Sequence, residues 1–223
     1  MLQFLKRALG NPDHTYPGNR TLPMKLLIAT FNKGKLGDYQ EFCKGLPLEA
    51  IGLDDMGIKE EFDEIYGTFE ENSREKAKFY AKLTDLPTIA DDSGIEIPFY
   101  HMEPGVNTKR WGGELSDEEY SAFILNKIKQ IPEGQRQAQM RAVLTLCISG
   151  NCYQAEGKIL GTLTDNMYEH GTTHGYPWDK VFILNDNGKY YEALNDDENY
   201  QFNHRRIAFD KLKRYLQSVQ DSN

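Results

Sequence analysis

This chain of 223 residues has few cysteines, no long apolar runs and no excess of positive charge. Its three cysteines, Cys43, Cys147 and Cys152, are too few and too irregularly spaced for a disulfide framework or a zinc site, so we expect reduced thiols and a cytoplasmic location. No apolar run is long enough to span a membrane. The net charge of −8 is unsuited to a broad nucleic-acid surface, which needs an excess of Lys and Arg. Neither a membrane nor a nucleic acid is therefore an expected partner.

The composition is that of an ordinary globular protein, with 39% hydrophobic and 27% charged residues. Residues 1–23 differ from the rest, because several residues interrupt the short helix that 2–9 could form. This segment also lacks the long apolar core of a signal peptide. We therefore expect a flexible N-terminal extension over 1–23 and one domain over 24–223. The interrupting residues are Asn11, Pro12, Pro17, Gly18 and Pro23.

Strands and helices alternate early in the chain, and strands dominate later. The apolar run 24–29 predicts a buried strand, which leads through a polar turn at 30–34 into a helix at 35–44. A short strand at 87–90 should be followed by an acidic turn at 91–94. This order predicts an α/β protein with a mixed sheet, whose ligand binds at the carboxyl ends of the strands. Further strands are expected at 48–53, 95–99, 137–149, 152–163, 181–184 and 189–193, with the long pair turning at Gly150 and Asn151.

Two later helices have marked starts. Ser116 and Glu119 have the spacing of a capping box, which predicts a helix running from there to about residue 131. Asn203 is a good N-cap for the last helix.

A phosphate site is predicted where the first strand turns into the first helix. The helix start offers backbone N–H groups and the positive end of the helix dipole, and Gly34 permits close approach of the backbone. Lys35 adds a positive charge, while Thr30 and Asn32 add hydrogen-bonding groups. The GxxxxGK[ST] pattern of a P-loop is absent. The alternative is an ordinary strand–helix turn with a solvated lysine.

An acidic set formed by Glu64, Asp91 and Asp92 predicts a magnesium site. Adjacent carboxylates at the end of an apolar strand are costly unless they are solvated or bound to a cation. Mg²⁺ prefers a few carboxylates together with water and phosphate oxygens, and a carboxylate beside it can orient or deprotonate water. Ser93 follows in a turn that can approach a ligand. Lys76 lies inside a helix predicted over 69–83, which the capping-box spacing of Thr68 and Glu71 starts, and it matters only if that helix faces the acidic set. The alternative is a plain acidic β-turn.

Aromatic and cationic residues near the C-terminus could bind a nucleotide base. Tyr176, Trp178 and Asp179 combine two rings that can stack on a base with a carboxylate that can read its edge. His204 and Arg205 lie at a predicted helix start and could bind the base edge or a phosphate. The alternatives are core or lid aromatics and a capped surface helix.

Taken together and in order, these segments resemble the inosine triphosphate pyrophosphatase family, the non-standard purine NTP pyrophosphatases. The resemblance runs from Lys25 to about Leu216, and IADDSG beside TFEEN is its most specific part. The matching segments are LLIATFNKGKLGDYQEF, GTFEENSREKAKFYAK, PTIADDSGIEIP, PGVNTKRWGG, GYPWDKVF and NHRRIAF.

The resemblance implies a role for each candidate residue. Thr30, Asn32, Lys35 and Lys76 would contact phosphates, and Asp92 would bind metal and activate water. Metal would also bind Glu64, and Asp91 would act as the partner of Asp92. Substrate contacts would come from Ser93, and base contacts from Tyr176, Trp178, Asp179, His204 and Arg205.

The resemblance also implies an elongated mixed β-sheet with flanking helices, two lobes around a central cleft, Mg²⁺ as cofactor and a homodimer. The activity it implies is Mg-dependent hydrolysis of nucleoside triphosphates to monophosphate and pyrophosphate, removing deaminated purine nucleotides such as ITP, dITP and XTP. Two alternatives stay open. One is a pyrophosphatase with a shifted base preference, and the other is a nucleotide-binding module that has lost turnover.

Four departures from the family pattern fall on the base-binding side, one of them Asn203 in place of a serine. Pro177 replaces a glycine, which removes an N–H and fixes φ. Lys180 replaces a proline, and Asn199 stands where the family has a lysine. The metal and phosphate residues all match, so the chemistry is a firmer expectation than the choice of purine.

Overall fold

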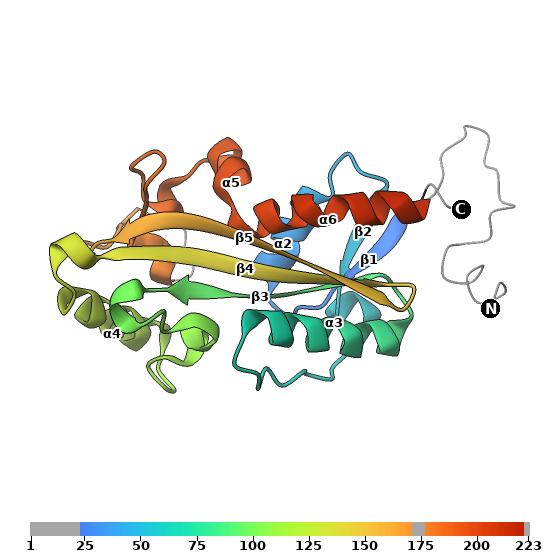
Figure 1. Cartoon of the computed structure of the whole chain (residues 1–223), viewed down its shortest axis with the longest axis horizontal. Coiled ribbons are helices and arrows are strands. Elements are labelled where there is room, and N and C mark those ends of the chain that lie inside the picture. Colours follow the sequence, from blue (N-terminus) through green and yellow to red (C-terminus); the bar gives the residue numbers. More distant parts are fainter. Residues whose placement is uncertain (1–22, 171–176, 221–223) are drawn as a thin grey trace, which may run out of the picture. The chain divides into compact units, whose positions relative to one another are not determined.

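The computed structural model describes residues 23–170 and 177–220, with side chains up to residue 216. In this part of the chain, six strands form one sheet in the order β2-β1-β3-β4-β5-β6, with helices flanking it (Figure 1). Parallel pairing of β1 with β2 and β3, and antiparallel pairing of β5 with β6, make the sheet mixed. The predicted α/β class with a mixed sheet and flanking helices is confirmed. The strands are β1 (Met24–Ile28), β2 (Leu48–Gly52), β3 (Thr88–Glu96), β4 (Gln137–Ile148), β5 (Asn151–Leu163) and β6 (Phe182–Leu184).

The helices account for much of the remaining described chain. They are α2 (Lys33–Phe42), α3 (Phe69–Thr84), α4 (Asp117–Lys129), α5 (Asp196–Phe202) and α6 (His204–Gln220). Short 3₁₀ turns join them, including η3 (Gly105–Arg110), η5 (Pro177–Lys180) and η6 (Tyr191–Ala193). None of the described helices has both the length and the apolar character of a membrane span.

The chain divides into two compact units, with β3, β4 and β5 each contributing to both. The first unit contains described residues 23–66, 70–91 and 144–154, and the second contains 67–69, 92–143, 155–170 and 177–220. The division falls between Asp91 and Asp92, within β3. One domain over 24–223 stays a prediction, and the expected extension falls, apart from Pro23, outside the described residues.

The first unit has its own apolar core beneath the parallel pair β1 and β2. The strands pair in register from Met24 with Leu48 to Ile28 with Gly52. The apolar run of β1 is buried here, as its sequence predicts, and α3 contributes Ala77 to the same core. Other core members are Leu27, Ala29, Ile51, Leu53, Ile58, Tyr80, Ala90 and Cys147.

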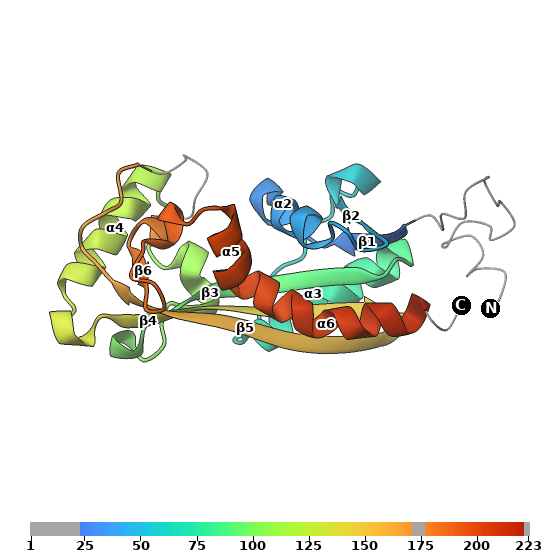
Figure 2. The same cartoon turned by 90° about the horizontal axis from the view of Figure 1, so that it is seen from above.

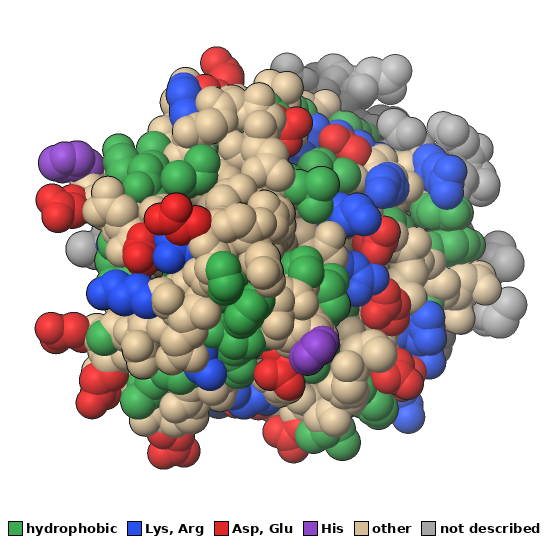
Figure 3. Space-filling view, turned by 60° about the vertical axis from the view of Figure 1, so that its left-hand side comes forward, with side chains coloured by type: hydrophobic (Ala, Val, Ile, Leu, Met, Phe, Trp, Pro, Cys, Tyr) green, Lys and Arg blue, Asp and Glu red, His purple; other side chains and the backbone are tan. Residues whose placement is uncertain are grey.

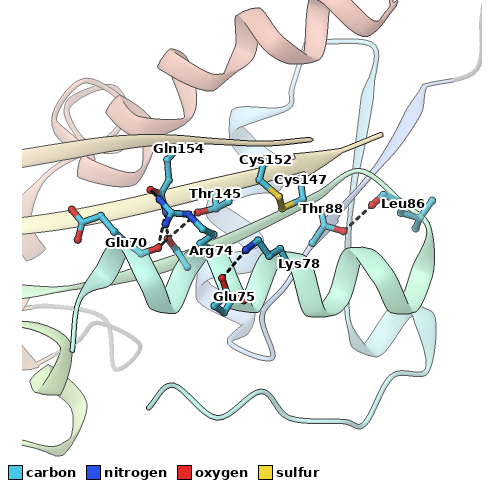
Figure 4. Close-up of a disulfide and its surroundings, with 11 residues drawn as sticks. Glu70, Arg74, Glu75, Lys78, Leu86, Thr88, Thr145, Cys147, Cys152 and Gln154 are labelled. Atoms are coloured by element: carbon cyan, nitrogen blue, oxygen red, sulfur yellow. Dashed lines mark hydrogen bonds and ion pairs between the residues drawn. A yellow bond between two sulfur atoms is a disulfide. The ribbon is translucent and has the colours of Figure 1, made fainter. Parts of the chain in front are cut away.

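A hairpin between β4 and β5 corrects the expectation of three reduced cysteines, because Cys147 and Cys152 form a disulfide (Figure 4). Ser149 and Gly150 both have positive φ, 50° and 80°, as in the type I′ turns that tight hairpins favour. The turn is therefore one residue earlier than predicted. This register places Cys147 and Cys152 opposite each other with Cα atoms 4.1 Å apart, within bonding reach. Cys43 is buried and does not take part in this disulfide.

A polar network joins the same hairpin to α3 (Figure 4). The Gln154 side-chain amide donates to Thr145 Oγ1 at 2.9 Å and to the Glu70 carbonyl at 2.6 Å. Arg74 Nη2 donates to Gln154 Oε1 at 2.7 Å. Ser73 Oγ lies 3.0 Å from Thr145 Oγ1, so the buried hydroxyls are satisfied within the unit.

The second unit packs α4 and the turn η5 around a separate apolar core. Ser116 caps α4 through the predicted capping box with Glu119, and the helix ends at Lys129, two residues before the predicted end. Ile124 and Ile128 of α4 are fully buried. They join a core that includes Ile95, Ile97, Met140, Ile159, Leu163, Trp178, Val181, Phe182 and Leu184.

Helix α6 lies along β5 (Figure 2) and starts at His204. A Cβ on Gly157 of β5 would lie 2.0 Å from the His204 carbonyl oxygen and 2.7 Å from the Ala208 nitrogen. Only glycine permits this approach of strand to helix. Asn203 Oδ1 accepts from the Arg205 and Arg206 N–H groups at 2.9 and 3.2 Å, so the predicted cap is confirmed.

Two predicted local structures are wrong. The acidic turn at 91–94 is instead the middle of the continuous strand β3, because pairing within the sheet overrides the turn preference of Asp, Ser and Gly. The predicted strand 189–193 is only a single bridge between Ile183 and Tyr190, after which the chain enters the 3₁₀ turn η6.

Charges of both signs are interspersed on the face shown in Figure 3, where acidic and basic side chains alternate with apolar ones.

Candidate active site

The candidate residues fall into a group of charged residues in the first unit and a pocket in the second. In the first unit, α2 starts at Lys33, two residues earlier than predicted, with Asn32 as its N-cap. Asn32 Oδ1 accepts from the Lys35 N–H at 3.0 Å, and Thr30 Oγ1 accepts from the Asn32 N–H at 3.1 Å. The predicted strand–turn–helix is confirmed, with Lys35 in the first turn of the helix.

Lys35 forms a largely buried ion pair with Asp91, which the sequence separates from it by 56 residues. Lys35 Nζ lies 3.2 Å from Asp91 Oδ1 and 3.1 Å from Oδ2. The Asp91 side chain is 1% exposed and that of Lys35 is 14% exposed. Removing both charges from water costs free energy, so the ion pair is weak evidence for a stabilising role. Holding two buried charges is better suited to a site that must present charge to a ligand.

A second pair joins Lys76 of α3 to Glu64 in the same unit. Lys76 Nζ lies 2.6 Å from Glu64 Oε1, and the two side chains are 13% and 31% exposed. The condition attached to Lys76, that its helix should face the acidic residues, is therefore met for Glu64. In this structure each of the two candidate phosphate-binding lysines, Lys35 and Lys76, contacts one carboxylate of the acidic set.

Asp92 follows Asp91 directly in β3 and is also buried, at 5% exposure. Its Oδ1 accepts from the Ser93 N–H at 2.9 Å. Successive side chains of a strand project to opposite faces, so the strand separates the Asp91 and Asp92 carboxylates more than the expected turn would. Strand geometry thus favours different roles for these two residues rather than one shared function.

The second unit holds a pocket with about 410 Å³ of empty space, part of it open to solvent. The pocket brings together five of the predicted substrate residues, Ser93, Trp178, Asp179, His204 and Arg205. Gly94, Ile95, Thr108 and Met140 complete its lining.

Arg205 is anchored within this pocket. Its Nη2 donates to Ser93 Oγ at 3.1 Å, joining the start of α6 to β3. His204 is 5% exposed at the first position of α6, and Trp178 is 2% exposed within η5. A cation, an imidazole, a carboxylate and an indole thus line one partly apolar pocket, which suits a planar heterocycle with a polar edge.

The acidic residues fit a hard divalent cation in chemical type. Counted over the whole residue, Asp91 and Asp92 are 2% and 5% exposed, and both offer carboxylate oxygens to a metal. Glu64 offers carboxylate oxygens too. Over the described ranges, no three His, Cys, Asp or Glu side chains cluster closely enough to hold a metal. Mg²⁺ needs only one or two protein carboxylates when water and phosphate oxygens complete its coordination, so the donor set is compatible with it.

Comparison with known proteins identifies the family. A sequence model described as the Ham1 family matches residues 26–215. The chain belongs to the Ham1 family. It is 34% identical to the dITP/XTP pyrophosphatase of Geobacter sulfurreducens over 86% of this chain and 96% of that protein, and 33% identical to the Bacillus subtilis dITP/XTP pyrophosphatase over the same shares.

Solved structures agree with this assignment. The Staphylococcus aureus Ham1 protein superposes with a TM-score of 0.74 at 29% identity, covering 87% of this chain and 99% of that one. A HAM1 protein from Coxiella burnetii gives 0.75 at 26% identity, covering 87% and 98%. The resemblance drawn from the sequence motifs is thereby confirmed for both family and fold.

Tyr176, one of the predicted base contacts of this Ham1-family chain, lies outside the described residues. Sequence reasoning missed Ile95, Thr108 and Met140 as pocket residues. Thr108 belongs to the PGVNTKRWGG segment that carried the resemblance, so a signal for it existed. Nothing in the sequence marked Met140, because it lies within a long strand whose apolar residues cannot be told apart by pattern alone. The roles of all the candidate residues stay predictions.

Proposed function

We propose that this Ham1-family protein hydrolyses nucleoside triphosphates between the α and β phosphates, releasing a monophosphate and pyrophosphate, and acts on deaminated purine nucleotides such as ITP, dITP and XTP. Relatives named dITP/XTP pyrophosphatase, 33–34% identical over nearly their whole length, support both the reaction and the substrate class. The structural observation that carries the proposal is the buried Lys35–Asp91 pair, because it keeps a cation and a carboxylate ready for an anionic, metal-bearing ligand.

Lys35 and Lys76 are the proposed phosphate contacts, with Thr30 and Asn32 beside them at the start of α2. Each lysine exchanges its carboxylate partner for a phosphate oxygen when the nucleotide binds. The ammonium groups then stabilise the negative charge that collects on the leaving pyrophosphate. This exchange keeps both lysines neutralised before and after binding.

Glu64 and Asp92 are the proposed protein ligands of Mg²⁺, which when bound neutralises phosphate charge and polarises the phosphoryl oxygens. Asp92 orients a water and accepts its proton as the water oxygen attacks the α-phosphorus. The bond from that phosphorus to the oxygen bridging the α and β phosphates breaks, and pyrophosphate leaves with the oxygen. Asp91, freed from its ion pair with Lys35 when the nucleotide binds, is the proposed partner of Asp92 in this step.

The pocket of the second unit is the proposed base site. His204 and Arg205 supply donors, Asp179 supplies an acceptor, and Trp178 supplies an aromatic wall. Tyr176 and Ser93 complete the predicted contacts. A deaminated purine carries an acceptor at position 6 where adenine carries a donor, so donors in the pocket favour it. A mismatched buried polar group costs about 1–3 kcal/mol, which corresponds to roughly a 5- to 150-fold preference.

Pyrophosphate release, with Mg²⁺ and with a chelator, tests the proposal across inosine, xanthosine, adenosine, guanosine and pyrimidine triphosphates. We expect Mg-dependent release that is fastest with inosine and xanthosine triphosphates. If pyrophosphate is released only from some other nucleotide, the proposed reaction stands but the proposed substrate class is wrong. Nucleotide binding without pyrophosphate release would instead indicate a nucleotide-binding module. The reason to consider that outcome is Asn199, which stands where the family has a lysine.

An Asp92→Asn variant tests the assigned role of that residue. Removing the proton acceptor should lower kcat by about 10²–10⁴-fold while Tm changes little. Asp186→Asn is the matched control, because Asp186 is an exposed loop residue outside the pocket. Full turnover in a folded Asp92→Asn protein would refute the role.

A homodimer and a cytoplasmic location complete the proposal. Light scattering coupled to size exclusion would give the mass of the native particle, to be compared with the 25.6 kDa chain. The cytoplasmic proposal rests on the nucleotide substrate, since the Cys147–Cys152 disulfide removes the argument from reduced thiols. Cell fractionation would test it.

A further inference from the structure

The hydroxyl of Tyr120 lies at a junction behind two walls of the second unit's pocket. Tyr120 belongs to α4 and is absent from the pocket lining. Trp178 Nε1 lies 3.1 Å from the Tyr120 oxygen, and the hydroxyl also bonds the Thr108 carbonyl oxygen. Trp178 and Thr108 both line the pocket, so one hydroxyl joins two pocket residues that are 70 positions apart in sequence.

The direction of each hydrogen bond follows from the chemistry of the groups. An indole N–H can only donate and a carbonyl oxygen can only accept, so the Tyr120 oxygen accepts from Trp178 and its proton goes to Thr108. Burial raises the pKa of the Tyr120 hydroxyl, and the bond from Trp178 is a smaller opposing effect. The hydroxyl therefore stays protonated at neutral pH and keeps both bonds.

Thr108 passes this constraint on to β3. Its Oγ1 donates to the Gly105 carbonyl at 2.6 Å and accepts from the Ile95 N–H at 3.0 Å. A Cβ on Gly94 would lie 2.3 Å from the same Oγ1, so the η3 turn lies directly against the strand. Little space remains for Thr108 to move once the Tyr120 hydroxyl holds its carbonyl.

Because of the bond to Tyr120, the indole N–H of Trp178 is not available to a ligand in the pocket. Its Nε1 is the single polar atom of the side chain, and Tyr120 occupies it from behind. The Trp111 ring packs against the Trp178 ring with 6.0 Å between ring centroids, and this contact further restrains the indole. Trp178 can therefore offer a ligand a flat apolar surface but no hydrogen-bond donor.

We infer that Tyr120 is a positioning residue for nucleotide recognition: its hydroxyl locks Trp178 and Thr108 as the fixed walls against which the base stacks. This inference rests on the proposed function and goes beyond it, because Tyr120 contacts neither the pocket space nor any proposed catalytic residue. Discrimination by hydrogen bonding then falls to other polar residues of the proposed base site, among them Asp179, His204 and Arg205, while Tyr120 sets the shape of the pocket.

The same core contains a matched control. The Tyr100 hydroxyl also donates to a backbone carbonyl, that of Lys127 at 2.8 Å, and burial raises the pKa of Tyr100 too. Tyr100 packs against Trp111 in the same aromatic cluster. It does not line the pocket and bonds no residue that does. Tyr100→Phe therefore removes an equivalent hydroxyl without releasing a pocket wall.

The kinetic experiment compares Tyr120→Phe, Tyr100→Phe and the unmodified enzyme with inosine triphosphate as substrate and inorganic tripolyphosphate as a base-free inhibitor. We expect Tyr120→Phe to raise KM roughly 3- to 10-fold, as the loss of one or two net hydrogen bonds implies, with kcat almost unchanged. The inhibition constant of tripolyphosphate should not change, and Tyr100→Phe should match the unmodified enzyme in KM. Equal changes in both variants, or a fall in kcat at constant KM, would overturn the inference.

A spectroscopic experiment keeps the inference testable if the protein turns over no nucleotide. The chain has two tryptophans, so ¹⁵N-indole labelling gives two N–H resonances, which Trp111→Phe assigns. The Trp178 resonance should move upfield in Tyr120→Phe, stay in place in Tyr100→Phe, and inosine should shift it more weakly in Tyr120→Phe. An unmoved Trp178 resonance would overturn the inference whatever the activity, whereas absent turnover with a moved resonance would overturn the proposed function alone.

Discussion

Replacing Gly157 by alanine should push the start of α6 away from β5. The added Cβ would lie 2.0 Å from the His204 carbonyl oxygen, 2.7 Å from the Ala208 nitrogen and 3.0 Å from Ile207 Cβ. An ordinary carbon–oxygen contact is about 3.3 Å, so the first turn of the helix must retreat by roughly 1.3 Å. Overpacking of this kind costs about 1–3 kcal/mol. For a chain of this size, each kcal/mol lowers Tm by about 2–4 °C, which gives a fall of roughly 2–12 °C.

The same displacement should weaken nucleotide binding, because His204 and Arg205 occupy the turn that moves. Differential scanning calorimetry measures the Tm, and the KM for inosine triphosphate measures the pocket. Gly37→Ala is the matched control: Gly37 lies inside α2, and its added Cβ would meet nothing within 4 Å. It should stabilise the protein by about 0.4–1 kcal/mol. If Gly157→Ala melts like the unmodified protein, the close approach of α6 to β5 is wrong, and if Tm falls at constant KM, α6 does not position the pocket.

Two further predictions concern the stability of each unit. Arg141 donates to Glu156 and holds the pKa of that carboxyl below its ordinary value of 4.5, so its contribution to stability is present above pH 4.5 and is lost as pH falls through the lowered pKa. Glu156→Gln should therefore lower Tm at pH 7 but not at a pH below both values, and a difference that persists in acid would contradict this reasoning. The loop closed by Cys147 and Cys152 is short, so the chain-entropy model assigns the disulfide about 2 kcal/mol. Reductant should lower the Tm of the unmodified protein but not that of Cys152→Ser, and equal responses would refute the estimate.

Local signals in the sequence predicted the parts of the fold that depend on local physics. The apolar run of β1 became a buried strand, and Ser116 with Glu119 formed the expected capping box. The Asp-Asp-Ser-Gly segment failed because its turn preference is local whereas the pairing of β3 is not. The disulfide failed for a related reason. Cys147 and Cys152 face each other only in one hairpin register, and shifting the turn by one residue would place them out of line.

The candidate site shows the same limit. Motifs identified Lys35 and Asp91 separately, but nothing in the sequence says that residues 56 positions apart form an ion pair. Tyr120 had no motif at all, because a tyrosine in an amphipathic helix looks like a core residue until its partner Trp178 is known. Spacing along the chain thus reveals which residue types are present, while the contacts that define their roles come from the tertiary structure.

The two lysine–carboxylate pairs of the first unit also bear on how the reaction would end. Under the proposed function, Asp91 and Glu64 are internal competitors of the product, since each can reclaim the lysine that holds a pyrophosphate oxygen. These competitors are tethered, so their effective concentration is fixed by the fold and does not fall as the cellular pool is diluted. Pyrophosphate would then leave a site that restores its own ion pairs, and the enzyme would resist inhibition by the product it releases.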